Sequence, residues 1–247
     1  MNGMALHGGV IPYGGTFLVF TDYARGAVRL SALQRARVIY VMTHDSIGLG
    51  EDGPTHQPVE HLASLRAMPN LLVMRPCDAV ETAECWDIAL RQADRPTVLA
   101  LTRQNLPQLR LAPAGESLSA RGAYRIKAAS AQRRVVILAT GSEVSLASEC
   151  AAALEAEGVG ADVVSMVCTE LFDEQLPAYR AEILPEDALI VSIEAASTFG
   201  WQRYTGRGGL TIGLDRFGAS APAGDLFAHF GFTAEAIVPQ IQNALKR

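Results

Sequence analysis

The sequence predicts an α/β protein built of two successive three-layer α/β/α domains, each with a mostly parallel sheet that helices cover on both faces. Short apolar runs rich in β-branched residues alternate with longer amphipathic segments along the chain, as is typical of strands that alternate with helices. A polar stretch rich in turn residues interrupts this alternation between Pro107 and Ser119. We therefore expect a first domain over residues 1–112, a linker over 113–121 and a second domain over 122–247.

The first domain begins with the apolar run Thr16–Phe20, which predicts a strand. Thr21 can cap the helix that follows, because its hydroxyl can accept a hydrogen bond from a backbone N–H of the first turn. Asp78 can cap a later amphipathic helix in the same way. The strands expected in this domain are 16–20, 37–43, 71–74 and 97–101, and the expected helices are 22–34, 59–67 and 78–92.

The second domain continues this alternation of strands and helices. Gly141 and Ser142 follow an apolar strand and begin a helix that Gly158 can end in a left-handed conformation. A glycine and a serine at a helix start could suggest a phosphate site, but neither a GxGxxG pattern nor a P-loop lysine is present. The strands expected here are 135–139, 162–167, 189–193 and 210–214, with a last helix over 233–245.

The composition is that of an ordinary globular protein, with 49% hydrophobic and 19% charged residues. The formal net charge of -5 argues against a nucleic-acid-binding surface, although a few local arginines could still form a sugar-phosphate pocket. No apolar stretch is long enough for a membrane span and no signal peptide is recognisable, so we expect a cytoplasmic protein without a membrane partner. The cysteines lack CxxC spacing, which favours reduced, buried thiols and no metal site.

The segment with most chemistry is His44–Gln57, which reads HDSIGLGEDGPTHQ and follows the predicted strand 37–43. Its glycines allow the backbone to adopt positive φ angles and to approach a ligand closely. A neutral imidazole can donate a hydrogen bond from one nitrogen and accept one at the other, which suits a hydroxylated substrate. The segment thus makes His44, Asp52 and His56 candidate site residues, although a single histidine after a strand is more commonly a capping or packing residue, and Asp52 before Gly53-Pro54 is by itself a normal turn residue.

Arg103 also follows a predicted strand, 97–101. In open parallel sheets, ligands bind beyond the carboxyl ends of the strands, so His44 and Arg103 are expected at the same edge. The sequence does not specify the distance between them. The planar guanidinium of an arginine suits phosphate oxygens, although an isolated arginine is more commonly part of a surface ion pair.

These motifs together resemble transketolase, the thiamine-diphosphate enzyme that moves two-carbon ketol units between sugar phosphates. The resemblance covers essentially the whole chain, in order. Besides the segment 44–57, it rests on the motifs RPCD at 75–78, TRQNL at 102–106, TGSEV at 140–144 and GASAP at 218–222. It implies a pyrimidine-binding domain of the thiamine-diphosphate-binding fold, followed by a transketolase C-terminal domain.

The resemblance also implies roles for the candidate substrate residues. By this likeness Arg103 binds the substrate phosphate and His44 holds the phosphate end of the sugar. Asp52 accepts a hydrogen bond from a substrate hydroxyl and favours one stereochemistry, and His56 contacts the oxygens near the reacting carbons. A polyol phosphate needs such directional partners, because a wrong hydroxyl leaves buried groups unpaired.

Three aromatic residues, Phe17, Phe20 and Tyr23, are core residues by their pattern alone. The resemblance implies instead that they pack around the aminopyrimidine ring of thiamine diphosphate, since a flat heteroaromatic ring gains from aromatic contact and water exclusion. Glu51 and His61 are interpreted as structural residues, and we expect Glu194 and Trp201 to be packing and interface residues. His7 has no predicted role.

Parts of the family pattern are missing from this sequence. It contains no Gly-Asp-Gly motif for diphosphate and metal, and the activating glutamate of the family lies before the segment that matches Met1–Gly9. We therefore expect a C-terminal portion that starts within the pyrimidine-binding domain and has no catalytic residue of its own. Thiamine diphosphate and Mg²⁺ (or Ca²⁺) belong to the complete enzyme, and we expect neither to bind tightly to this chain alone.

The expected function is thus ketol transfer in the pentose phosphate pathway and the Calvin cycle, carried out only with a partner that supplies the N-terminal domain. Self-association as a homo-oligomer is also expected. One alternative is a portion of a related enzyme, deoxyxylulose-phosphate synthase or the β subunit of a 2-oxoacid dehydrogenase. Another is a non-catalytic interaction subunit, which the missing catalytic groups would suit and the retained substrate residues would not require.

Overall fold

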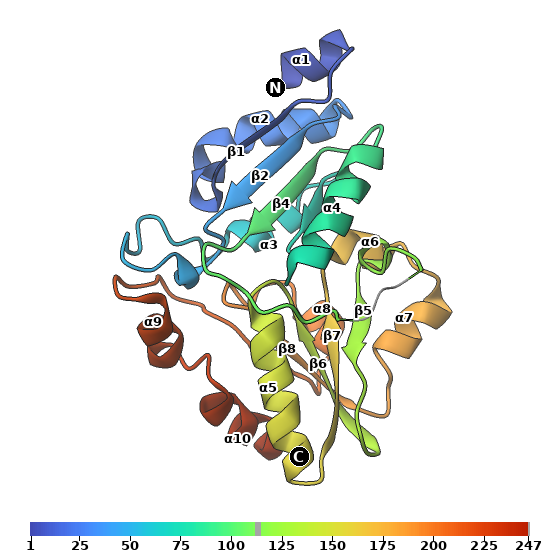
Figure 1. Ribbon diagram of the computed structural model, residues 1–247, viewed down its shortest axis with the longest axis vertical. Helices are drawn as coiled ribbons and strands as arrows, with labels where there is room; N and C mark the ends of the chain where they lie inside the picture. Colours follow the sequence, from blue (N-terminus) through green and yellow to red (C-terminus); the bar gives the residue numbers. More distant parts are fainter. Residues whose placement is uncertain (112–114, 247) are drawn as a thin grey trace.

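The computed structural model describes residues 1–111 and 115–246, and its strands form two sheets, one in each half of the chain (Figure 1). Pro113 and the expected domain boundary after residue 112 lie outside the described residues. The fold class is confirmed, because the first sheet is wholly parallel, the second is mostly parallel, and helices pack against both. Among the described residues no helix is both long and apolar enough to span a membrane.

The first sheet has the strand order β1-β2-β4-β3 and is wholly parallel. Alternate side chains of these strands face opposite helices, as the pleat requires. Tyr40 and Met42 face the apolar layer of α2 and α3, whereas Ile39 and Leu99 face α4. The elements are β1 (Tyr13–Phe17), α2 (Thr21–Leu33), β2 (Ile39–Thr43), α3 (His61–Arg66), β3 (Leu72–Met74), α4 (Ala79–Arg91) and β4 (Thr97–Leu101).

The start of this domain differs from the prediction. The strand expected over 16–20 lies at Tyr13–Phe17, and Leu18–Phe20 form a 3-10 helix, η1. Glycines are depleted in strands, so Gly14 and Gly15 were poor strand signals. Gly15 fits here because a Cβ at this position would lie 2.9 Å from the carbonyl oxygen of Val41 on β2. A short helix, α1 (Asn2–His7), also precedes β1.

The second sheet has the order β5-β7-β6-β8-β9, and only the β5–β7 pair is antiparallel. Val135 and Ile137 face the layer of α5 and α10, and Val136 and Leu138 face the other side with Phe172. The elements are β5 (Tyr124–Lys127), β6 (Arg133–Ala139), α5 (Glu143–Ala156), β7 (Gly160–Ser165), α6 (Thr169–Asp173), α7 (Pro177–Ile183), β8 (Leu189–Ile193), α8 (Gln202–Thr205), β9 (Leu210–Ile212), α9 (Ala223–His229) and α10 (Ala234–Ala244).

The two sheets share a packed interface. Tyr124, Val167 and Leu171 of the second half belong to the same apolar cluster as Ile39 and Leu72 of the first. All four cysteines are unpaired and buried, as the sequence analysis expects. The two halves of the chain are therefore held together by a continuous core, and not only by the connection between them.

Candidate functional site

The carboxyl ends of β1, β2 and β4 meet at one edge of the first sheet. Thr43, the last residue of β2, lies beside Phe17 on β1 and beside Leu101 on β4. His44 follows directly and has a φ angle of 60°, in the left-handed region that non-glycine residues rarely adopt. This conformation turns the chain out of the strand and brings the imidazole onto the ring of Phe17, with the ring centroids 3.7 Å apart.

The predicted aromatic residues and both histidines form one group, which we call the aromatic cluster (Phe17, Phe20, Tyr23, His44 and His56). Phe17 and Phe20 stack with centroids 5.9 Å apart, and Phe20 meets His56 edge-on at 5.7 Å. Tyr23 lies 5.9 Å from Phe20 and is 88% exposed. The other members are half-buried, so the cluster presents aromatic faces at the surface and is not a closed core.

The charged candidates lie close enough to His44 to act on its protonation. Burial and the positive charge of Arg103 lower the pKa of His44, while the carboxylates of Asp52 and Asp45 oppose that shift. A lowered pKa keeps the imidazole neutral at neutral pH. Arg103 and Asp52 are exposed, and within the described ranges neither side chain has an ion-pair partner. The structure thus brings His44, Asp52, His56 and Arg103 to the same edge.

The second half of the chain packs against the segment 44–57 and supports it. The Gln57 amide donates to the carbonyl oxygens of Gly50 and Ala219, at 3.0 and 2.8 Å, and its own oxygen accepts from the Ala219 N–H at 3.1 Å. The Ser220 hydroxyl donates to the carbonyl oxygen of Glu51 at 2.5 Å. The GASAP motif therefore lies against the segment that carries Asp52 and His56.

A glycine in this segment makes room for the loop after β4. A Cβ at Gly48 would collide with the side-chain amide of Gln104, the residue after Arg103. The Gly48 position thus allows the loop that carries Arg103 to approach the segment that carries His44. A hollow of about 280 Å³ beside this loop is lined in part by Thr102, Gln104 and Asn105.

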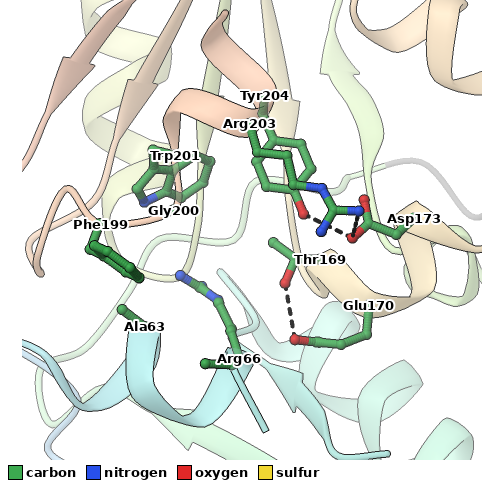
Figure 2. Close-up of a pocket in the computed structure, with 11 residues that line it drawn as sticks. Ala63, Arg66, Thr169, Glu170, Asp173, Phe199, Gly200, Trp201, Arg203 and Tyr204 are labelled. Atoms are coloured by element: carbon green, nitrogen blue, oxygen red, sulfur yellow. Dashed lines mark hydrogen bonds and ion pairs between the residues drawn. The ribbon is translucent and has the colours of Figure 1, made fainter. Parts of the chain in front are cut away.

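A separate cavity of about 180 Å³ lies between the two halves of the chain and contains none of the predicted site residues (Figure 2). Arg66, Glu170, Trp201 and Tyr204 are among its lining residues. Trp201 is buried, and its indole N–H donates to the carboxylate of Glu194 at 2.9 Å. The expectation that Glu194 and Trp201 are packing and interface residues agrees with this geometry.

The aromatic cluster fits one part of the cofactor that the sequence analysis expects. Partly exposed aromatic rings suit a flat heteroaromatic ring, and Phe20 and Phe17 present such rings beside His56. Over residues 1–111 and 115–246 no group of three or more His, Cys, Asp or Glu side chains is arranged to hold a metal ion. The exposed faces of the aromatic cluster are thus chemically compatible with a flat heteroaromatic ring.

Asp45 and Arg75 are two buried residues near the site that were not predicted from the sequence. Asp45 follows His44, and Arg75 begins the RPCD motif, yet both are fully buried and ion-paired, with Arg75 Nε 2.7 Å from Asp45 Oδ2. The only feature of the sequence that could have pointed to them is that Asp45 lies in the segment 44–57 and Arg75 in the RPCD motif. Burial of a charged pair depends on long-range packing, which a local pattern does not report.

Comparison with known proteins places the chain in a family. The family model "Transketolase, pyrimidine binding domain" matches residues 1–108, and "Transketolase-like TK C-terminal domain" matches residues 122–233. The transketolase of Sinorhizobium medicae is 60% identical over 248 residues, which cover 100% of this chain. The chain belongs to the transketolase family. It corresponds to the pyrimidine-binding and C-terminal domains of transketolase and spans 36% of the length of the S. medicae protein.

Solved transketolase structures share this fold. A transketolase from Pichia stipitis in complex with sedoheptulose 7-phosphate superimposes with a TM-score of 0.88 at 46% identity, over 95% of this chain and 34% of that chain. A protein described as a split gene transketolase, inactive β4 tetramer, superimposes with a TM-score of 0.83 at 25% identity. The match covers 99% of this chain and 79% of that one, so transketolase chains of similar extent are known.

Proposed function

We propose that this chain forms the substrate-binding and pyrimidine-binding part of a transketolase, which moves a two-carbon ketol unit from a ketose phosphate to an aldose phosphate. The observation that carries the proposal is the common edge of β1, β2 and β4. There His44 contacts Phe17 and His56 contacts Phe20, and the charges of Arg103 and Asp52 act on the pKa of His44. A transketolase from P. stipitis has been crystallised with a ketose phosphate, sedoheptulose 7-phosphate.

In this proposal each polar residue contacts a different part of the sugar. The Arg103 guanidinium binds the phosphate, because its planar fork matches two phosphate oxygens and no side chain of the described residues occupies it. His44, neutral at neutral pH, donates one hydrogen bond near the phosphate end. Asp52 accepts from a hydroxyl and selects its configuration, and His56 donates to the oxygens near the reacting carbons.

Phe20, Tyr23 and Phe17 would hold the aminopyrimidine of thiamine diphosphate. The cofactor, when bound, supplies the nucleophilic carbon that carries the ketol unit. This chain contributes aromatic contact and exclusion of water on one side of the ring. The resemblance to transketolase assigns the diphosphate, the Mg²⁺ (or Ca²⁺) and the activating glutamate to regions beyond the match of this chain.

The proposal therefore includes a partner that carries the N-terminal transketolase domain, together with self-association. The domains 1–112 and 122–247 would act as one unit with that partner, in the pentose phosphate pathway and the cytoplasm. A second candidate is a non-catalytic oligomer. It is favoured by one observation, since the split-gene relative of similar extent is described as an inactive tetramer. In that case the chain alone assembles without binding sugar phosphates.

The proposal is tested by supplying the N-terminal region of the S. medicae transketolase in trans, with thiamine diphosphate and Mg²⁺. Transfer from xylulose 5-phosphate to ribose 5-phosphate is expected from the mixture and not from the chain alone. Arg103→Ala should raise the KM for both sugar phosphates by at least about tenfold, since a charge-assisted hydrogen bond is worth about 1.5–3 kcal/mol.

Arg134→Ala is the matched control, because Arg134 is an exposed arginine on β6 in the other half of the chain. It should leave KM unchanged. If the mixture transfers no ketol unit, or if Arg103→Ala behaves like the control, the proposed role fails. Pyruvate offered as donor distinguishes transketolase from a deoxyxylulose-phosphate synthase or a 2-oxoacid dehydrogenase.

A further inference from the structure

Charged side chains from both halves of the chain meet at their interface and form what we call the interdomain ion cluster. Asp45, Arg66 and Arg75 come from the first half, and Glu143 and Glu194 come from the second. The side chains of Asp45, Arg75, Glu143 and Glu194 are each no more than 1% exposed, and that of Arg66 is 15% exposed. The cluster is attached to the segment 44–57 through Asp45, which directly follows His44.

Arg75 is the centre of this cluster. Its Nε donates to Asp45 at 2.7 Å, and its Nη1 donates to the carbonyl and hydroxyl oxygens of Thr140, at 3.0 and 2.8 Å, and to Glu143. The backbone is tied as well, because the Arg75 N–H donates to Val167 at 2.8 Å. One guanidinium thus connects the residue after His44 with the strand end that precedes α5.

Gly141 makes this arrangement possible. It has a φ angle of 52°, and a Cβ at this position would lie 2.8 Å from Arg75 Nε. Its N–H donates to the carbonyl oxygen of Arg75 at 3.0 Å. The missing side chain of Gly141 therefore provides the space through which Arg75 reaches Glu143 and Thr140.

Glu194 connects the cluster to the core of the second half. Its carboxylate accepts hydrogen bonds from both terminal nitrogens of Arg66 at 2.8 Å, from the Thr140 hydroxyl at 2.7 Å and from the Trp201 indole N–H at 2.9 Å. Thr140 accepts from Arg75 and donates to Glu194, so the hydrogen bonds are continuous from Trp201 to Asp45.

Such a cluster is a costly way to hold two domains together. The attraction within a buried ion pair offsets little more than the free energy lost on desolvation of its charges, and apolar residues of similar size are often as stabilising. The interface already has an apolar layer that includes Tyr124, Val167 and Leu171. The cluster adds a defined relative orientation of the groups it joins, because each charge-assisted hydrogen bond holds its partner in one geometry.

His44 needs such support, since its left-handed backbone is strained for a residue with a side chain. We propose that Asp45 and Arg75 are positioning residues, through which Glu143 and Glu194 hold His44 and the segment 44–57 in the binding conformation. This inference rests on the proposed function of His44. It makes the second half of the chain a part of the substrate site, although that half contributes no residue to the four candidates.

The test compares two interdomain contacts in the full chain without substrate. Asp45→Asn and Glu143→Gln weaken the interdomain ion cluster. Glu174→Gln is the matched control. The Glu174 carboxylate accepts hydrogen bonds from both terminal nitrogens of Arg95 across the same interface, at 2.7 and 2.9 Å, but it is not part of the interdomain ion cluster. Amide hydrogen exchange over residues 44–57 and the imidazole resonances of His44 are measured by NMR.

In Asp45→Asn and Glu143→Gln, exchange of the 44–57 amides should accelerate by about tenfold or more, and the His44 resonances should shift. Glu174→Gln should change neither. If Glu143→Gln does not fold, Thr140→Val takes its place, since it removes the shared hydroxyl and keeps every charge. Unchanged exchange in the folded cluster variants, or the same acceleration in the control, overturns the proposal.

These measurements are independent of the ketol-transfer test. Failure of Arg103→Ala to affect KM would remove the proposed substrate site and leave the exchange result standing. Unchanged exchange in Asp45→Asn would remove the positioning role and leave ketol transfer standing. In the reconstituted enzyme, Asp45→Asn should raise KM for the sugar phosphates by about tenfold, with a smaller effect on kcat.

Discussion

At the scale of single residues, the chemistry of the candidate site depends on where neighbouring groups place charge around His44. The imidazole lies against Phe17, which limits access of water to one face of the ring. Arg103 disfavours its protonated form, and Asp52 and Asp45 favour it. His44 is therefore a neutral hydrogen-bonding group whose state depends on the residues proposed to bind substrate.

This balance predicts how substitutions change the pKa of His44. Arg103→Gln removes a positive charge that destabilises the imidazolium, so the pKa should rise. Asp52→Asn removes a negative charge that stabilises it, so the pKa should fall further. Titration of the His44 resonances by NMR measures both, with His229 as an internal reference in the other half of the chain. Shifts of the same sign in both variants would contradict this electrostatic account.

At the scale of elements, local patterns located most strands and the helices α2, α3, α4, α5 and α10, but not the start of the first domain or the short helices α1, α6, α7, α8 and α9. The runs 37–43 and 97–101 correspond to β2 and β4, because a buried parallel strand is a continuous apolar run. β1 was misplaced by three residues, since it contains Gly14 and Gly15 and pairs closely with Val41. β5 was missed because it is a short, half-exposed edge strand.

The turn between β6 and α5 provides a prediction at this scale. Gly141→Ala should destabilise the chain by about 3–4 kcal/mol, because a Cβ there adds both a strained φ and a collision with Arg75. Gly158→Ala is the matched control, since Gly158 has a φ of 80° and a Cβ added there would meet no atom within 4 Å. It should cost only about 1–2 kcal/mol.

Urea unfolding followed by circular dichroism gives both free energies of unfolding. Equal losses in the two variants would mean that Arg75 moves away from the new methyl group without penalty. The difference between the variants thus isolates the contact between Gly141 and Arg75 from the cost of the left-handed backbone.

At the scale of the whole molecule, the interface between the two sheets determines the shape of the candidate site. The GASAP motif packs on the segment 44–57, and the interdomain ion cluster lies behind it. Neither half by itself contains all the contacts that hold His44, Asp52 and His56. We therefore expect the two halves to unfold together.

Glu194 gives the corresponding prediction for pH dependence. Burial by itself would raise its pKa, but the charges of Arg66 and Arg75 and the hydrogen bonds from Arg66 and Thr140 lower the pKa to about 2. A lowered carboxylate pKa contributes stability that is present above the unfolded value near 4.5 and is lost as the pH falls toward 2. This contribution is about 3 kcal/mol at neutral pH.

Glu194→Gln should therefore lower the free energy of unfolding by about 3–5 kcal/mol at pH 7, because it leaves the largely buried guanidinium of Arg66 without its charged partner. The loss should become smaller as the pH falls below 4.5. Urea unfolding between pH 3 and 7 measures this, with Glu174→Gln as the partly exposed control, expected to cost about 0–1 kcal/mol throughout. A pH-independent loss in Glu194→Gln would contradict the prediction.

The sequence by itself determined the order of most strands and helices and the positions of His44 and Arg103 after two apolar runs. It could do so because burial and turn formation follow local periodicity. Only the tertiary structure decided that Phe17 stacks on His44, that Gln57 binds Ala219 and that Arg75 is buried against Gly141. Those contacts depend on the strand order β1-β2-β4-β3 and on the packing of two sheets, which join residues far apart in the chain.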